Sequence, residues 1–259
     1  MKTSQWAAVS AAVIVVSALV SPRAYSQGLP AGLTGSLAAN PAIVQAGQTP
    51  KLKWSINYPS VVKQFVNIVS SGSGTGSMGG TLTPIQPLFV DIRILGQGVT
   101  YTASGSSSYT FVPTEATMSY NNTTSYKRLF YGTNPSINPG TIVSTSTILT
   151  DSRVDANKPL RFGGRYYFNG QWSTYYKSHD GNDNVRYLVN GDVPPSNVPG
   201  YNAPSLASFL RPYLDSAGYV KIGPMDVIVF MELTHSSAQK SNTGYDLQDM
   251  VLLVTFRKN

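Results

Sequence analysis

The chain of 259 residues has a formal charge of +7, with 19 Lys and Arg against 12 Asp and Glu, and it contains no cysteine. The cations are scattered along the sequence, which argues against the clustered charge that nucleic acid or an anionic membrane surface would require. Disulfides are excluded, so a fold outside the cell would depend on core burial and on any metal ion that it binds.

Residues 1–26 are predicted to be a secretory signal peptide. Lys2 supplies a positive charge, Trp6 to Val20 form an apolar segment, and Ala24-Tyr25-Ser26 is a small-x-small cleavage site. Cleavage would leave 17 basic and 12 acidic residues, a formal charge of +5. A retained N-terminal anchor is the alternative. No later segment reaches the roughly 18 apolar residues of a membrane helix, so we expect a secreted protein, extracellular or periplasmic, without membrane insertion after cleavage.

The composition predicts an all-β fold. Only 12% of residues are charged and two are glutamates, Glu115 and Glu232, whereas long helices favour Ala, Glu, Lys and Leu. Residues 27–113 are expected to form an Ig-like β-sandwich, and residues 114–259 a larger antiparallel β-domain. One short helix is expected at Ser205–Leu210, before Pro212 stops it.

Turn signals divide most of the chain into short strands. The strands expected before the C-terminal region are residues 33–41, 43–47, 52–58, 61–69, 88–95, 99–103, 109–112, 126–131, 141–149 and 185–189. Strands 88–95 and 99–103 are predicted to form a hairpin about Gly96-Gln-Gly98. In Arg165–Tyr176, an Asn169-Gly170 type I′ turn would pair Tyr167 with Trp172.

Two groups of residues carry a resemblance to known proteins. Ala39, Pro41, Gly47, Leu52, Trp54 and Ser55 resemble the opening strands of bacterial immunoglobulin-like modules, without the cysteine pair of antibody domains. The strings at residues 190–195, 208–215, 220–224 and 244–256 resemble a family of secreted bacterial β-proteins. This second resemblance implies a location and a fold type, and no activity.

The C-terminal region is predicted to hold two adjacent strands that are buried on both faces, Val227–Leu233 and Tyr245–Phe256. Glu232, Asp246 and Asp249 lie where these strands meet their loop. With Asp246 in the turn, the three carboxylates could converge on a structural calcium ion, which accepts irregular sets of oxygen ligands. The alternative is that Asp246 caps the turn and Asp249 pairs with an arginine.

Catalytic residues are scarce in this sequence. His179 and His235 each lie beside a turn, and there is no G-x-S-x-G elbow or spaced zinc motif. A glycoside hydrolase needs two carboxylates around the sugar, and only the group near Glu232 offers them. We therefore expect no enzyme and no cofactor apart from the calcium ion.

The aromatic hairpin is the candidate binding site. Tyr167 and Trp172 would lie on one face and could stack on sugar rings. We favour the interpretation that one face of the hairpin is core, with Trp172 in it, and that the other is a stabilising cross-strand pair. The sequence favours a structural or adhesive protein of the bacterial cell surface or extracellular matrix, with a surface protein or glycan as partner. The alternative is a carbohydrate-binding module that uses Tyr167 and Trp172, and a glycoside hydrolase is less favoured.

Overall fold

The computed structural model describes residues 34–40 and 51–57 as backbone strands, and residues 60–69, 80–193, 209–242 and 244–258 in full. Three predictions fall outside these ranges. They are the signal peptide at residues 1–26, the strand at 43–47, and all but the last two residues of the helix at 205–210. In the described part of the chain, no helix is long and apolar enough to span a membrane.

The fold is all-β with antiparallel sheets, as predicted. The five-stranded sheet has the order β10 (Arg153–Val154), β5 (Leu88–Gly96), β16 (Met250–Arg257), β15 (Asp226–Met231), β14 (Val185–Val189). The main path of the seven-stranded sheet is β3 (Val66–Val69), β4 (Thr81–Pro84), β11 (Leu160–Phe168), β8 (Thr114–Tyr120), β9 (Lys127–Gly132). Two short strands also pair with β11, namely β12 (Gln171–Trp172) and β13 (Tyr176–Lys177).

Two separate hairpins and four short 3-10 turns complete the described structure. The hairpins pair β1 (Thr34–Asn40) with β2 (Lys51–Asn57), and β6 (Thr100–Tyr101) with β7 (Thr110–Phe111). The 3-10 turns are η1 (Val62–Gln64), η2 (Asn134–Ser136), η4 (Arg211–Tyr213) and η5 (Ser237–Gln239). Pro212 lies within η4, where the chain makes a single turn and then becomes extended at Leu214.

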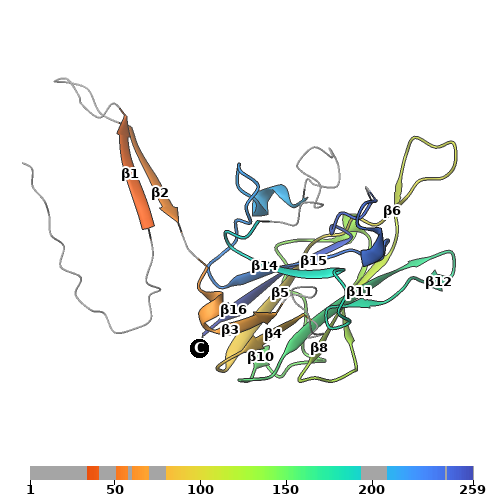
Figure 1. Cartoon of the computed structure of the whole chain (residues 1–259), viewed down its shortest axis with the longest axis horizontal. Coiled ribbons are helices and arrows are strands. Elements are labelled where there is room, and N and C mark those ends of the chain that lie inside the picture. The colour runs from red at the N-terminus through yellow and green to blue at the C-terminus, as the bar shows by residue number, and fades with distance from the viewer. Residues whose placement is uncertain are drawn as a thin grey trace, which may run out of the picture. The chain divides into compact units, whose positions relative to one another are not determined.

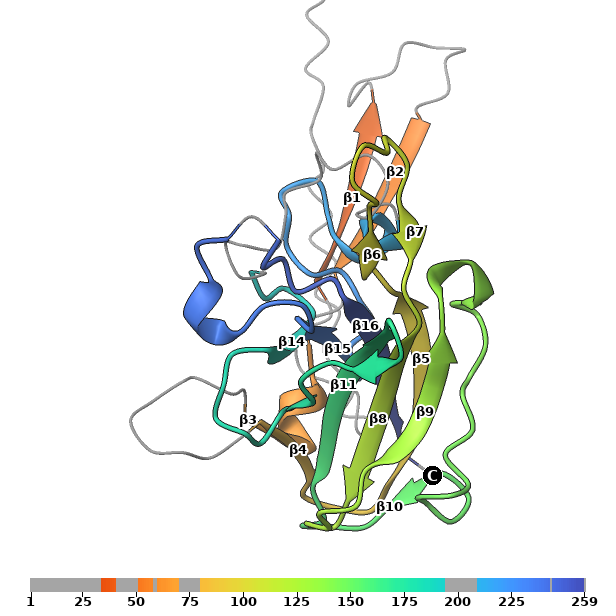
Figure 2. The same cartoon turned by 90° about the vertical axis from the view of Figure 1, so that its right-hand side faces the viewer.

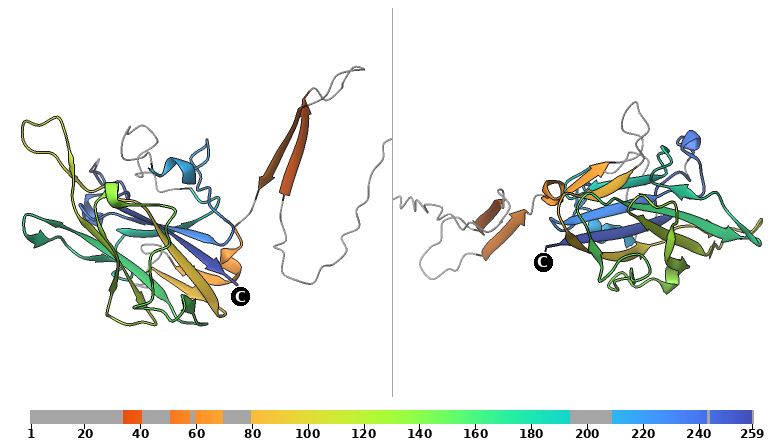
Figure 3. Two further views of the ribbon diagram at one scale, coloured as in Figure 1. Left: turned by 180° about the vertical axis from the view of Figure 1, so that it is seen from behind. Right: turned by 90° about the horizontal axis from the view of Figure 1, so that it is seen from below.

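The two larger sheets pack face to face around one hydrophobic core (Figures 1 and 3). Alternate residues of each strand point inward, as the two-residue period of a strand requires. On β5 these include Val90 and Ile92, on β16 Leu252 and Val254, and on β11 Phe162, all fully buried. The result is a two-layer sandwich whose seven-stranded sheet keeps its other face for polar and aromatic side chains.

The five-stranded sheet is buried on its second face as well. Ile228 and Phe230 of β15 form a separate apolar cluster with Val251 of β16, and Leu210 and Val220 from the segment 209–222 pack into it. β15 and β16 are direct neighbours, paired from Asp226–Thr255 to Phe230–Val251. The prediction of two adjacent C-terminal strands, both buried on two faces, is confirmed, but the second strand begins at Met250 and not at the predicted Tyr245.

The sheets run across residue 113, where the sequence suggested a boundary between domains. β5 precedes that residue and pairs with β16, and β4 precedes it and pairs with β11. Residues 32–259 accordingly form one compact unit. Strands that pair across more than 75 residues of sequence leave no local signal in composition. The turn at Pro113 therefore resembled the end of a domain.

Two predicted strand arrangements are wrong. Residues 88–95 and 99–103 do not form a hairpin, because β5 continues to Gly96 between β10 and β16. The chain then leaves the sheet at Gln97, whose buried side-chain amide donates to the carbonyls of Val99 and Val112. Residues 141–149 form turns with one isolated bridge, although their Thr, Ile and Val favour strands. Residue preference does not supply a partner strand.

The hairpin at Asn169-Gly170 is confirmed. Tyr167 pairs with Trp172 and Phe168 with Gln171, and Asn169 and Gly170 have φ angles of 49° and 79°. Both turn residues lie in the left-handed region that a type I′ turn requires and that Asn and Gly tolerate best. This turn is a local property, so the sequence was sufficient to place it.

Candidate functional site

The outward side of the seven-stranded sheet gathers aromatic and arginine side chains. β11, β8 and β9 lie side by side (Figure 2), with Arg165 opposite Glu115 and Glu115 opposite Tyr131. These three residues alternate with core residues along their strands and therefore share the outward side. We call the following set the aromatic–arginine face: Glu115, Arg128, Tyr131, Arg165, Tyr167, Trp172, Tyr175 and Lys177.

Trp172 lies on the surface at one end of the aromatic–arginine face. Its ring centroid is 5.1 Å from that of Tyr167, its cross-strand partner, and 5.6 Å from that of Tyr131 on β9. Trp172 is 37% exposed and Tyr131 is 41% exposed. Tyr167 and Trp172 share one face of the hairpin, as predicted. The prediction that Trp172 is a core residue is wrong, because β12 pairs with β11 outside the main path of the sheet and leaves the indole partly exposed.

Glu115 fixes the two arginines of this face. It is 4% exposed, and each carboxylate oxygen accepts one hydrogen bond, from Arg128 Nε and from Arg165 Nε, both at 2.7 Å. The Arg165 guanidinium then lies over the Trp172 ring, with Cζ 4.1 Å from the centroid, and Arg128 lies 4.9 Å from the Tyr131 centroid. Contacts of this kind are favourable because the ring face is electronegative. One buried carboxylate thereby orients two cations and, through them, two exposed rings.

Tyr175, just before β13, and Lys177, within it, extend the face. The Tyr175 and Thr117 hydroxyls are hydrogen-bonded at 2.6 Å, and burial raises the pKa of Tyr175 to about 12. Lys177 Nζ lies 5.1 Å from the Tyr175 centroid. Gly163 of β11 permits this arrangement, because a Cβ there would come within 2.9 Å of the Tyr176 carbonyl oxygen. β13 can approach β11 this closely only where the side chain is absent.

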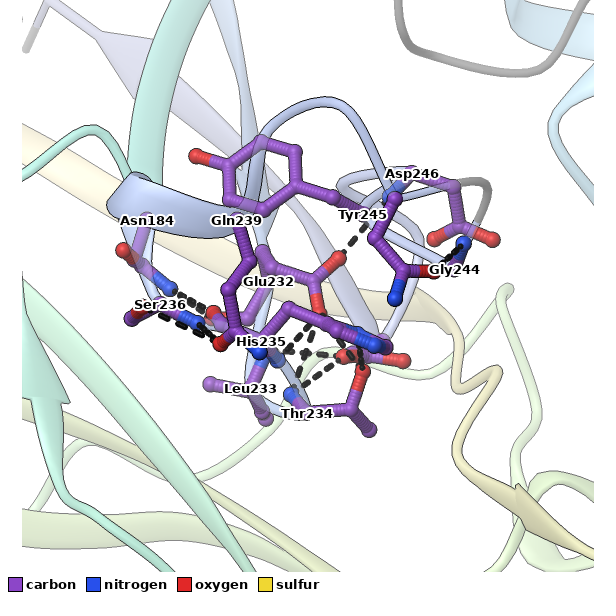
Figure 4. A network of polar contacts seen from close by, with 12 residues as sticks. Asn184, Glu232, Leu233, Thr234, His235, Ser236, Gln239, Gly244, Tyr245 and Asp246 are labelled. Atoms are coloured by element: carbon purple, nitrogen blue, oxygen red, sulfur yellow. Dashed lines mark hydrogen bonds and ion pairs between the residues drawn. The ribbon is translucent and has the colours of Figure 1, made fainter.

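The second candidate site is the turn that joins β15 to β16, drawn in Figure 4. Glu232 follows β15 and is completely buried. Its Oε1 accepts hydrogen bonds from the Thr234 N–H at 3.0 Å, the Thr234 hydroxyl at 2.6 Å and the His235 N–H at 2.9 Å. Its Oε2 accepts from the N–H groups of Asp246 at 2.9 Å and Leu247 at 3.3 Å. The carboxylate thus ties the two ends of the turn together.

Asp249 and Asp246 lie beside Glu232, and the three carboxylates are called the acidic turn below. Asp249 Oδ2 accepts from the N–H groups of Leu233 at 2.7 Å and Thr234 at 2.9 Å. Burial raises the pKa of Asp249 well above its ordinary value, and the charge of Glu232 raises it further. Burial also raises the pKa of Asp246 to about 6. The site favours the protonated forms of Asp246 and Asp249, because burial and the nearby charge of Glu232 both raise the pKa of these two carboxyl groups.

Hydrogen bonds of the acidic turn engage most of the oxygens that a calcium ion would need. Among the described residues, no group of three His, Cys, Asp or Glu side chains is arranged to hold a metal ion. Asp246 Oδ1 caps the turn by accepting from the Gln248 N–H at 3.0 Å, and Asp249 accepts from backbone N–H groups where an arginine was the expected partner. Calcium at Glu232, Asp246 and Asp249 stays a prediction, and it would require the ion to displace N–H donors from Glu232.

The histidines pack against neighbours in separate regions. His179 stacks on Tyr126 with an interplanar angle of 14°, and its Nδ1 lies 2.7 Å from the Tyr126 hydroxyl. Burial lowers the pKa of His179. His235 Nδ1 lies 2.8 Å from the Thr234 hydroxyl. Both histidines therefore take part in the local packing of turns.

Sequence reasoning missed the anchoring role of Glu115. It also missed Arg128 and Arg165, because their convergence depends on pairing among three strands. One signal was available: the chain has only two glutamates, and both are buried acceptors that gather donors from separate segments. In a chain with so few glutamates, each glutamate is a candidate for a buried hydrogen-bond acceptor.

Comparisons with protein-family models, with curated proteins and with solved structures found no match to this chain. The resemblance to a family of secreted bacterial β-proteins stays a prediction. The chemistry of the two sites is therefore the basis for a function.

Proposed function

We propose that this is a secreted, non-catalytic adhesive protein that binds polysaccharide through the aromatic–arginine face. The observation that carries the proposal is the open aromatic cluster of Tyr131, Tyr167 and Trp172. Trp172 combines 37% exposure with ring neighbours at 5.1 and 5.6 Å. Aromatic side chains provide large apolar contact surfaces of fixed geometry, and the C–H face of a sugar ring is a complementary partner.

Preorganisation supports binding at this position. Arg165 is held by Glu115 and stacks on Trp172, so a ligand meets an indole whose orientation is already restricted. Restricting a binding side chain in advance reduces the entropy that is lost on association. A site on a sheet also has a stiffer backbone than a site on a long loop.

The acidic residues favour adhesion over hydrolysis. Glycoside hydrolysis requires one carboxylic acid to protonate the leaving oxygen and a second carboxylate to act as nucleophile or base. Glu115 accepts hydrogen bonds from two arginines, and Glu232 is fully buried with five donors on its oxygens. Both glutamates thus use both carboxylate oxygens as acceptors for donors within the protein.

Trp172→Ala tests the proposal. We expect the variant to lose retention in native affinity electrophoresis on gels that contain polysaccharide, because the central stacking ring is gone. Its melting temperature should stay within a few degrees of the parent value, since Trp172 is partly exposed and lies outside the core. Tyr219→Ala is the matched control, because Tyr219 is a 43% exposed aromatic residue in the segment 209–222.

Two outcomes would count against polysaccharide binding. In one, Trp172→Ala is retained on the gels as strongly as the parent. In the other, the variant loses about 3–5 kcal/mol of stability, as truncation of a core tryptophan would, so that lost retention reflects unfolding.

A further inference from the structure

We propose that the polysaccharide bound by the aromatic–arginine face is acidic, a polyuronate whose carboxylates pair with the cations of this face. This inference rests on the proposed function and specifies its ligand. It comes from the charges that lie between and beside the exposed rings. Those charges are spread between residues 115 and 180 of the sequence, and the fold brings them together.

The local charge of the face is positive. Four cations lie on or beside it, and two carboxylates accompany them, which gives a formal charge of +2. The cations are Arg128, Arg161, Arg165 and Lys177, and the carboxylates are Glu115 and Asp180. His179 adds no charge at neutral pH, since burial lowers its pKa. A neutral glycan would gain nothing from this excess, whereas a polyanion would.

Arg128 and Arg165 keep N–H donors that can bind a ligand. In the described part of the chain, their side-chain contacts are the Nε bonds to Glu115 and the ring contacts. The guanidinium carries five N–H groups in a fork that matches a planar carboxylate, so four remain on each arginine. The side chains of Arg128 and Arg165 are 53% and 30% exposed. Both can reach a second carboxylate while Glu115 holds them.

Aromatic rings and cations alternate along the aromatic–arginine face. This arrangement suits a polysaccharide that presents both apolar ring faces and acid groups. Arg165 lies over Trp172, Arg128 over Tyr131, and Lys177 near Tyr175. In a polyuronate, every sugar offers a ring face for stacking and a carboxylate for pairing. Single-stranded nucleic acid also combines stacking with negative charge. Arg128 and Arg165 each already donate a hydrogen bond of 2.7 Å to a carboxylate, that of Glu115. Because a carboxylate is the group that they bind within the protein, we favour the polyuronate.

The experiment compares polygalacturonate with its fully methyl-esterified form, by affinity electrophoresis and titration calorimetry on the intact protein. The two polymers share a backbone and differ in charge. We expect the esterified form to bind at least about tenfold more weakly. Binding of the acid form should also weaken as salt rises from 50 to 500 mM, because salt screens exposed charges.

Lys177→Gln isolates the charge without disturbing the Glu115 pairs. We expect it to weaken polygalacturonate binding by about two- to fivefold, the range of one exposed ion pair. Lys221→Gln makes the same charge change at an exposed residue of the segment 209–222 and should leave binding unchanged. Both variants should melt like the parent.

Each outcome decides the matter. Equal, salt-insensitive binding of both polymers would overturn the acidic ligand and leave polysaccharide binding standing. Retention of neither polymer, nor of neutral polysaccharides, would overturn both proposals. Tighter binding of an oligo(dT) strand than of polygalacturonate would also overturn the inference, since nucleic acid would then be the better ligand.

Discussion

Glu232→Ala is expected to lower the free energy of unfolding by about 3–5 kcal/mol, because it leaves buried donors without an acceptor. Glu232 is fully buried and accepts from Thr234, His235, Asp246 and Leu247 at both ends of the β15–β16 turn. For a domain of this size, the loss corresponds to a fall in Tm of about 10 °C. Urea unfolding measures the free energy and thermal unfolding measures Tm, both followed by circular dichroism.

Glu232→Gln removes the charge of the side chain and keeps its shape, so it tests the two contributions separately. The amide keeps one acceptor oxygen and places an NH₂ group against N–H donors on the other side, so we expect a loss similar to that of the alanine variant. Asp91→Asn is the matched control, because the Asp91 pair with Arg257 involves an arginine that is 51% exposed. It should cost less than about 1 kcal/mol. A loss below 1 kcal/mol in both Glu232 variants would contradict the anchoring role.

Asp246→Asn is expected to raise stability at pH 8 by about 1–3 kcal/mol, and the gain should disappear near pH 4. Burial raises the pKa of Asp246 to about 6 in the folded protein, against about 3.9 in the unfolded chain. The folded state therefore holds this proton more tightly. Its contribution is fully present below pH 4 and is lost as the pH rises through about 6. Asparagine keeps an acceptor for the Gln248 N–H without the charge.

Thermal melting of both proteins from pH 4 to pH 8 checks this result. Asp249→Asn should behave in the same direction, because burial and the charge of Glu232 also raise the pKa of Asp249. A stability difference between parent and Asp246→Asn that does not vary with pH would show that the charge of Asp246 is irrelevant to folding.

The same melting curves test the calcium prediction when they are recorded with millimolar calcium and with chelator. A rise in Tm with calcium that is lost in Asp249→Asn would support an ion at the acidic turn. Equal melting temperatures in both solutions would contradict the calcium prediction. The hydrogen bonds of Glu232 would then be sufficient to stabilise the turn.

The features that the sequence predicted correctly are those whose cause is local. Asn169-Gly170 tolerates two left-handed residues in succession, so the register of Tyr167 with Trp172 follows from the turn. The C-terminal strands are consecutive in the chain, joined by residues 232–249, and their unbroken apolar runs predicted burial on both faces. Composition was sufficient for the all-β class.

The tertiary structure alone decided which distant strands pair and which side chains meet. β5 lies beside β16, and Arg257 reaches Asp91 across 166 positions of sequence. Likewise, Glu115, Arg128 and Arg165 converge only because β9, β8 and β11 are neighbours, with the register of β8 against β9 shifted by an irregularity between Ala116 and Thr117. Alternation along each strand divides its residues between two faces. It does not identify the neighbouring strand or the face that another sheet covers, because both depend on contacts between segments that are far apart in the chain.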